Sequence, residues 1–125
     1  MPDPLNVIVD LSHHNGIVGL AQAQAAGIVG VIHKATQGTG FTDPMYATNR
    51  TQAQAAGLLW GAYHFGVGAD GVEQADHFLR VVQPGPQDLV VLDLEANGQG
   101  PSMTLEEARA FVTHINDSIG RFPGL

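Results

Sequence analysis

The sequence predicts an α/β fold in which parallel strands alternate with helices, and three observations support this prediction. The segment QAQAAG occurs at residues 22–27 and again at 52–57, an offset of 30 residues (52 − 22). In both copies an Ala/Gln-rich stretch, which favours a helix, precedes a glycine and a short aliphatic run. The same alternation continues on both sides of the repeat, and βα units of about 30 residues are typical of parallel sheets with right-handed crossovers.

Each predicted element has its own signal. The apolar runs LNVIVD, IVGVIHKA, LLWGAYHF and DLVVLDLE predict strands at residues 5–10, 28–35, 58–65 and 88–95. The segments between and after them predict helices near residues 19–26, 44–56, 72–82 and 104–119. Gly27 and Gly57 suit helix C-termini, and TLEE at 104–107 is a capping box that opens the last helix. Residues 122–125 predict the turn into a fifth strand.

Length and composition exclude several classes of protein. The 125 residues suffice for one modest domain, predicted over residues 1–125. Five basic and twelve acidic residues give a net charge of −7, which argues against nucleic acid or an anionic membrane as partner. There is no cysteine, hence no disulfide framework. No apolar run approaches a membrane span, and the N-terminal stretch lacks the features of a signal peptide.

All four predicted strands end in residues whose side chains can transfer protons or bind ligands. These residues are Asp10, then His33 and Lys34, then Tyr63 and His64, and finally Asp93 and Glu95. In parallel sheets covered by helices, ligands bind at the carboxyl ends of the strands. We therefore expect the candidate site at this edge of the sheet.

The last strand carries two carboxylates, Asp93 and Glu95, at the end of a buried run. If Leu92 and Leu94 face the helices, strand alternation places both carboxylates on the other face, with Cα atoms about 6.5 Å apart. Two like charges at that separation raise the pKa of one of them, which yields one proton donor and one ionised carboxylate, the pair that glycoside hydrolysis uses. A cap for the following turn is the structural alternative, and Asp10 in the turn-rich DLSHHNG segment has the same alternative.

Other motifs give weaker signals. His13, His14, His33 and His64 are possible metal ligands, but the sequence has no His-x-His on the first strand and no His-Glu-x-x-His. The segment GTGFTD at 38–43 differs from a dinucleotide loop in having Asp43 where a glycine is needed. Trp60 and Tyr63 fit core positions as well as sugar-binding ones. We therefore expect no metal and no other cofactor.

Four segments together resemble the glycoside hydrolase family 25 lysozymes, the Chalaropsis-type N-acetylmuramidases. DLSHHNG resembles the family's Asp-x-Ser-x-x-x-Gly opening, and HKATQGTGFTDPMYATN resembles its Lys-Ala-Thr-Glu-Gly-Thr segment with the following Asp-Pro and Asn. AAGLLWGAYHF resembles its Gly-x-Tyr-His-Phe strand, and LDLE matches its Asp-x-Glu. The four segments occur in the family's order and cover nearly the whole chain.

The resemblance implies a TIM-like (β/α) barrel and cleavage of the β-1,4 bond between N-acetylmuramic acid and N-acetylglucosamine in peptidoglycan. It implies Glu95 as general acid, Asp93 as the group that assists the substrate acetamido group, and Asp10 as a third catalytic carboxylate. Substrate contacts would come from Tyr63 and from the motif positions Lys34, Gln37 and His64. The implied partner is the peptidoglycan glycan strand, and the implied location is secreted or at the cell wall.

Two departures from the family pattern bear on these expectations. Gln37 stands where the family has Glu, which removes one negative charge. Barrels of this type run to about 250 residues, so the chain is expected to supply the first four βα units and to stop before the fifth strand. A non-catalytic wall-binding fragment is therefore the alternative to an enzyme, although the retained Asp10, Asp93 and Glu95 favour the enzyme. Open strand edges would make a homodimer possible.

Overall fold

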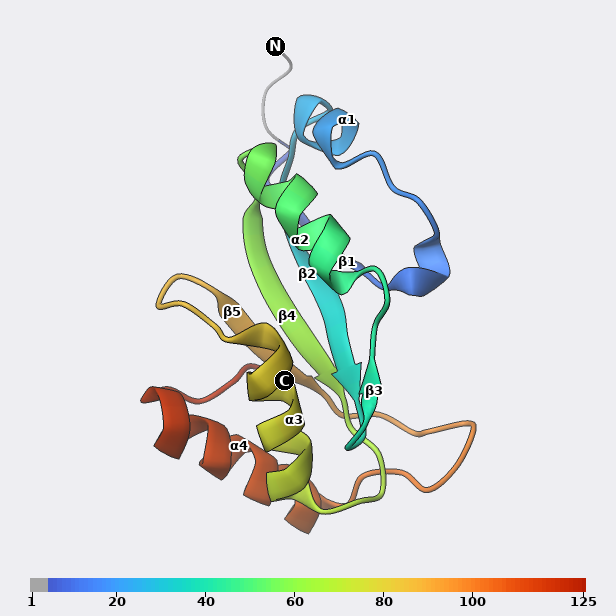
Figure 1. The fold of residues 1–125 in the computed structure, drawn as a ribbon, viewed down its shortest axis with the longest axis vertical. Helices are drawn as coiled ribbons and strands as arrows, with labels where there is room; N and C mark the ends of the chain where they lie inside the picture. Colours follow the sequence, from blue (N-terminus) through green and yellow to red (C-terminus); the bar gives the residue numbers. More distant parts are fainter. Residues whose placement is uncertain (1–4) are drawn as a thin grey trace.

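The computed structural model describes residues 5–125 and contains a twisted parallel sheet with helices packed on it (Figure 1). Residues 1–4, part of the stretch in which no signal peptide was found, lie outside the described residues. Four strands pair in parallel in the order β1 (Val7–Leu11), β2 (Ile28–Gln37), β4 (Leu59–Phe65) and β5 (Leu89–Asp93). The predicted parallel sheet is therefore confirmed, with strand ends that differ from the prediction by a few residues.

The helices follow the strands as predicted. They are α1 (Leu20–Ala25), α2 (Tyr46–Ala55), α3 (Gly71–Val82) and α4 (Leu105–Ile119). Both repeat helices end at an alanine C-cap, and the next residues, Gly27 and Gly57, adopt the positive φ angles of 104° and 77° that favour glycine. The predicted capping box at the start of α4 is present: Thr104 Oγ1 accepts from the Glu107 N–H, and Glu107 Oε1 accepts from the Thr104 N–H.

Two short elements were missed by the sequence analysis. A single 3₁₀ turn, η1 (His13–Asn15), follows β1, and its capping residue Ser12 belongs to the turn-rich segment. A two-residue strand, β3 (Phe41–Thr42), folds back antiparallel on the end of β2. Both elements lie where the parallel strands end, so they shape the edge of the sheet at which the site was expected.

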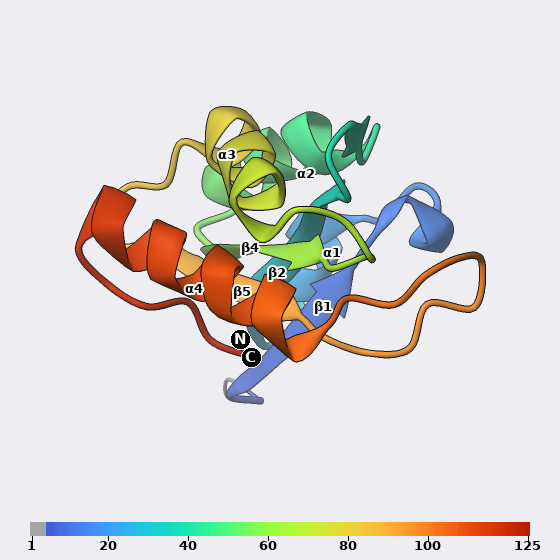
Figure 2. The same ribbon diagram turned by 90° about the horizontal axis from the view of Figure 1, so that it is seen from below.

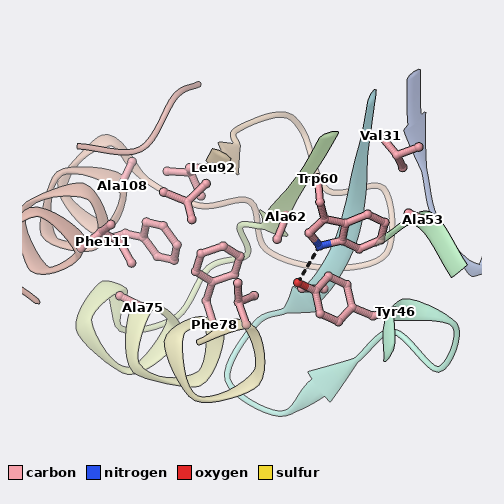
Figure 3. Close-up of a cluster of buried hydrophobic side chains, with 14 of the residues drawn as sticks. Val31, Tyr46, Ala53, Trp60, Ala62, Ala75, Phe78, Leu92, Ala108 and Phe111 are labelled. Carbon is pink, nitrogen blue, oxygen red and sulfur yellow. Dashed lines mark hydrogen bonds between the residues drawn. The ribbon is translucent and has the colours of Figure 1, made fainter. Parts of the chain in front are cut away.

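The core lies between the sheet and the helices. Figure 3 shows Phe78 and Phe111, from α3 and α4, packed near Leu92, while Trp60 donates a hydrogen bond of 3.2 Å to the Tyr46 hydroxyl. Figure 2 shows the sheet edge-on beneath α2 and α3. Trp60 is only 7% exposed, which makes it a core aromatic. Burial of these large side chains holds the strand ends in place.

The opposite face of the sheet carries the predicted site residues. On β5, Val90 and Leu92 are buried against the helices, so Val91 and Asp93 point the other way. Leu94 was expected to face the helices but is 37% exposed, because β5 ends at Asp93 and the alternation ends with it. Beyond β5, Gly124 exchanges two backbone hydrogen bonds of 2.9 Å with Val90 and Leu92, which agrees with the predicted turn toward a further strand.

Candidate active site at the carboxyl ends of the strands

The acidic residues predicted from the strand ends meet in one hollow. Its volume is about 650 Å³, and its polar lining consists of Asp10 from β1, Tyr63 from β4, Asp93 from β5 and Glu95 just after β5. Ile32 and Val91 form the apolar floor. Three strands and one loop therefore supply the polar groups, which come together because parallel strands end at the same edge of the sheet.

A second hollow of about 380 Å³ shares Tyr63, Asp93 and Glu95 with the first. Lys34 and Gln37 of β2 line it together. They can share a face at a spacing of three because Ala35 is an extra residue in the β2–β4 pairing, where Lys34 pairs with Tyr63 but Thr36 already pairs with His64. The bulge therefore brings the amide of Gln37 to the same side of the sheet as the Lys34 ammonium.

The Lys34 ammonium is buried at the site, with 7% of the residue exposed. Its Nζ donates a hydrogen bond of 2.6 Å to Gln37 Oε1 and lies 5.2 and 5.3 Å from the ring centres of Phe41 and Phe65. Burial lowers the pKa of Lys34, while the carboxylates Asp43 and Asp93 oppose that change. Lys34 thus places a positive charge beside the acidic hollow.

Asp93 has a raised pKa. Burial is the main cause, the charges of Glu95 and Asp10 add to it, and Lys34 acts in the opposite direction. The sequence analysis expected the raised pKa on the proton donor of the Asp93–Glu95 pair and the neighbouring charge as its cause. The structure instead raises the pKa of Asp93, the residue to which the resemblance gives the acetamido-assisting role, and does so mainly by burial. A more basic carboxylate is a better acceptor for an N–H donor.

Tyr63 stays protonated at the centre of the site. Burial raises the pKa of its hydroxyl to about 12, and Asp10 and Asp93 contribute in the same direction. A neutral phenol among three carboxylates is a hydrogen-bond donor, so Tyr63 can bind a ligand oxygen or steady one of the carboxylates.

His64 does not belong to this site, contrary to the expectation. It faces the helices, is fully buried, and lies between Thr36 Oγ1 at 2.7 Å and Gln74 Oε1 at 3.0 Å. A side chain without exposed surface cannot contact a substrate, so we remove His64 from the substrate-binding set. His33 is likewise buried, between the Lys34 carbonyl and Asn49. Strand alternation is the reason: both histidines precede or follow a site residue by one position.

Two loops contribute groups that the sequence analysis did not select. Ser12 and His14 after β1, and Asn97 and Gln99 after β5, also line the second hollow. Asn97 stabilises its own loop, because its backbone N–H donates to Ser102 Oγ at 2.9 Å and its Oδ1 accepts from the Gln99 N–H at 3.1 Å. The available signal was positional: both turn-rich segments directly follow strands that end in a carboxylate.

Asp43 anchors the rim of the site. Its carboxylate is buried and accepts from both the backbone N–H and ring Nδ1 of His13, each at 2.9 Å, and from the Met45 N–H. These hydrogen bonds outweigh burial and lower its pKa. Asp43, the residue that distinguishes the GTGFTD segment from a dinucleotide loop, therefore links the η1 turn to the segment after β3.

Other parts of the structure offer weaker candidates for a functional site. A hollow of about 610 Å³ lies between α3 and α4, lined by Val72, Leu105 and Arg109 among others, but it is on the helical layer, away from the strand ends. Within residues 5–125, no group of three His, Asp or Glu side chains is placed to hold a metal ion. Over the same range, no helix has the length and hydropathy needed to cross a membrane.

Comparison with known proteins identifies close similarities. A sequence model described as glycosyl hydrolases family 25 matches residues 9–125. Lysozyme M1 of Streptomyces globisporus is 32% identical, in an alignment that covers 91% of this chain and 41% of the relative. The N,O-diacetylmuramidase of a Chalaropsis species is 31% identical, over 93% of this chain and 63% of the relative.

Solved structures similar to this chain include a muramidase and a family GH25 lysozyme. The muramidase from Trichobolus zukalii superposes with a TM-score of 0.83 at 33% identity, over 91% of this chain and 61% of that one. A family GH25 lysozyme from Aspergillus fumigatus gives a TM-score of 0.81 at 31% identity, with the same coverage. The chain thus spans 41% to 63% of the length of the relatives named here.

Proposed function

The chain belongs to glycosyl hydrolase family 25, and from this premise we propose that it carries catalytic groups of a muramidase acting on peptidoglycan. The bond to be broken is the β-1,4 linkage between N-acetylmuramic acid and N-acetylglucosamine, and the place of action is the cell wall. The observation that carries the proposal is the meeting of Asp10, Asp93 and Glu95 with Tyr63 in one open hollow.

Glu95 is the proposed general acid. It is exposed at the first position past Leu94, on the loop that follows β5, and it lines both hollows. A carboxylic acid there can protonate the glycosidic oxygen as the bond to the anomeric carbon breaks. The leaving sugar then departs as a neutral alcohol, and the positive charge that develops on the other sugar faces the remaining carboxylates.

Asp93 is proposed to assist the substrate's own acetamido group. As the bond breaks, the acetamido oxygen attacks the anomeric carbon, and Asp93 accepts the hydrogen bond of the acetamido N–H. The raised pKa of Asp93 supports this role, because it makes the carboxylate a stronger acceptor. Water then opens the cyclic intermediate and returns the proton to Glu95.

The remaining groups are proposed to bind and orient the sugar. Asp10 adds negative charge on the β1 side of the hollow, where it can stabilise the charged transition state. The neutral Tyr63 hydroxyl can donate to a sugar oxygen. Lys34 and Gln37 line the adjoining second hollow, where a neighbouring part of the glycan strand would lie.

The test is Glu95→Gln, which keeps the shape of the side chain but cannot donate the proton. We expect release of reducing ends from purified peptidoglycan to fall by about 10²–10⁴-fold, with unchanged circular dichroism. Glu106→Gln, at an exposed position of α4, is the matched control and should leave the rate unchanged. Near-normal turnover of Glu95→Gln would refute the assignment.

The same assay separates the enzyme from a non-catalytic wall-binding protein of this fold. A protein that sediments with cell walls but releases no reducing ends, with or without Glu95, would support the binding function and contradict the muramidase. The enzyme proposal requires both binding and release in the unsubstituted protein, with only release lost in Glu95→Gln.

A further inference from the structure

Lys34 is the only lysine in the sequence, and it is buried beside the acidic hollow of a chain with a net charge of −7. Its hydrogen-bond partner, Gln37, carries no charge. Among residues 5–125, the ion pairs join His13 to Asp43, Arg50 to Asp88 and His114 to Asp76, and none includes Lys34. Within this described range, no carboxylate therefore pairs directly with the lysine charge.

A buried ammonium without an ion pair acts on the charges around it. Water has little access to it, because only 7% of Lys34 is exposed, its Nζ lies over the Phe41 and Phe65 rings, and one of its donors is used by the Gln37 amide. Asp93 and Asp43 are the carboxylates that respond to it. Asp43 already accepts hydrogen bonds from His13 and Met45, whereas Asp93 opens into the same hollow as Lys34.

We propose that Lys34 is a positioning residue that holds Asp93 in its ionised form, and that the neutral Gln37 leaves the lysine charge free to do so. This inference rests on the proposed function, since an ionised Asp93 is what the acetamido group needs. It adds that the acceptor role of Asp93 is set from β2, through a side chain that does not touch the reacting atoms.

The groups around Asp93 show why a cation is needed there. Asp10 from β1 and Glu95 after β5 oppose ionisation of Asp93 by their charge, and its partial burial opposes ionisation as well. Tyr63 from β4 is neutral. On the lysine side lie Asp43, its partner His13, and His14, which lines the second hollow. Among the groups of residues 5–125 that act on Asp93, Lys34 lowers its pKa and the others raise it.

The direct test is a carbon-13 NMR titration of the Asp93 carboxyl in the protein and in Lys34→Met. We expect the Asp93 pKa to rise by about one unit when the charge is removed, and to stay within a few tenths in Lys34→Arg, which keeps it. Arg109→Met removes a positive charge from the exposed face of α4 and should leave the Asp93 pKa unchanged.

If Lys34→Met does not fold, a second measurement tests whether the charges of Lys34 and Asp93 are coupled. Reductive methylation with carbon-13 formaldehyde labels Lys34 as the only lysine and retains its charge. Because coupling between two sites is reciprocal, Asp93→Asn should lower the Lys34 pKa by about one unit, the size of the change expected for Asp93 on loss of the lysine charge. A Lys34 pKa unchanged in Asp93→Asn would overturn the proposal.

Gln37→Glu tests the role of the neutral partner. The substitution keeps the side-chain shape and gives Lys34 a carboxylate partner, so we expect the Asp93 pKa to rise as it does in Lys34→Met. An unchanged Asp93 pKa would refute the claim about Gln37. These titrations require no substrate, so they distinguish failure of this inference from failure of the muramidase proposal. If Lys34 and Asp93 titrate as a coupled pair but the protein does not cleave cell walls, only the muramidase proposal is refuted.

Discussion

At the residue scale, the hydrogen bonds of the two buried histidines determine which ring nitrogen carries the proton. The Gln74 Nε2 group donates to the carbonyls of Val67 and Ala69, so Gln74 Oε1 must accept. His64 therefore carries its proton on Nε2, which donates to that oxygen, and its Nδ1 accepts from the Thr36 hydroxyl. A proton on Nδ1 would require the Thr36 hydroxyl to turn and accept, so burial of the charged ring is what opposes a second proton.

His33 is held in the other tautomer. Its Nδ1 donates to the Lys34 carbonyl at 2.7 Å, and its Nε2 accepts from Asn49 Nδ2 at 2.9 Å. Burial lowers the pKa of both histidines, to about 4 for His64. Each is neutral in the folded protein at neutral pH and resists taking a second proton, so each couples folding to pH.

The first prediction at this scale concerns acid stability. The folded-state pKa of His64 is lower than its ordinary value of 6.5, so the unfolded chain binds more protons between pH 6.5 and about pH 4. The free energy of unfolding should therefore fall as pH falls through this window, by about 3 kcal/mol from His64, and His33 acts in the same direction. Asp93, with a raised pKa, acts in the opposite sense near and above its usual 3.8.

Urea unfolding at a series of pH values checks this prediction. His64→Gln should flatten the pH dependence between pH 6.5 and 4, whatever it does to stability at neutral pH. His114→Gln, at a partly exposed histidine that contacts Asp76 of α3, is the control and should retain the slope of the unsubstituted protein. An equally steep loss of stability in His64→Gln would contradict the assignment.

At the element scale, the packing of α3 on α4 depends on a missing side chain. A Cβ at Gly71, the first residue of α3, would lie 2.1 Å from the Glu107 carbonyl oxygen and 3.0 Å from the Ala110 Cβ. No side chain can fit there while the helices keep their distance. Through this contact the two helices hold Phe78 and Phe111 together over the sheet.

We therefore predict that Gly71→Ala destabilises the protein by about 1–3 kcal/mol, although alanine is the better helix former. The measurement is the free energy of unfolding in urea. Gly40→Ala is the control, because no atom lies within 4 Å of the position that a Cβ would take there, and it should be nearly neutral. A stabilising Gly71→Ala would mean that α3 and α4 move apart freely.

At the scale of the whole molecule, one face of the sheet is covered by helices and the other is open in the part of the chain that the structure describes. Ile8 on β1 is 52% exposed, and Ile32 and Val91 line the floor of the acidic hollow. β1 lies at one end of the strand order and exposes a parallel edge. Open edges and apolar faces of this kind favour association.

We predict that the 125-residue chain self-associates as its concentration rises, measured by light scattering after size exclusion. Ile8→Glu should reduce association, because it places a charge on the open face. Ile17→Glu is the matched control: Ile17 is 96% exposed, but it lies on the segment after η1, away from the sheet. A monomer at all concentrations, unaffected by Ile8→Glu, would show that the face is tolerated in water.

The element order and the chemical type of the site could be predicted from the sequence, because both depend on local signals. The repeat glycines, the Thr104–Glu107 capping box and the aliphatic runs each act within a few residues. The carboxylates Asp10, Asp93 and Glu95 end strands that point to the same edge, which is a general consequence of parallel pairing. Their meeting in one hollow was therefore predictable before their contacts were known.

Only the tertiary structure decided which neighbours share a face. Residues one position apart on a regular strand face opposite sides, and the extra residue Ala35 in β2 changes this alternation so that Lys34 and Gln37 meet on the site face. A bulge depends on pairing with a strand about thirty residues away. Burial of Lys34 and the pKa of Asp93 depend on groups from several strands at once. A local sequence pattern cannot predict the combined effect of these groups.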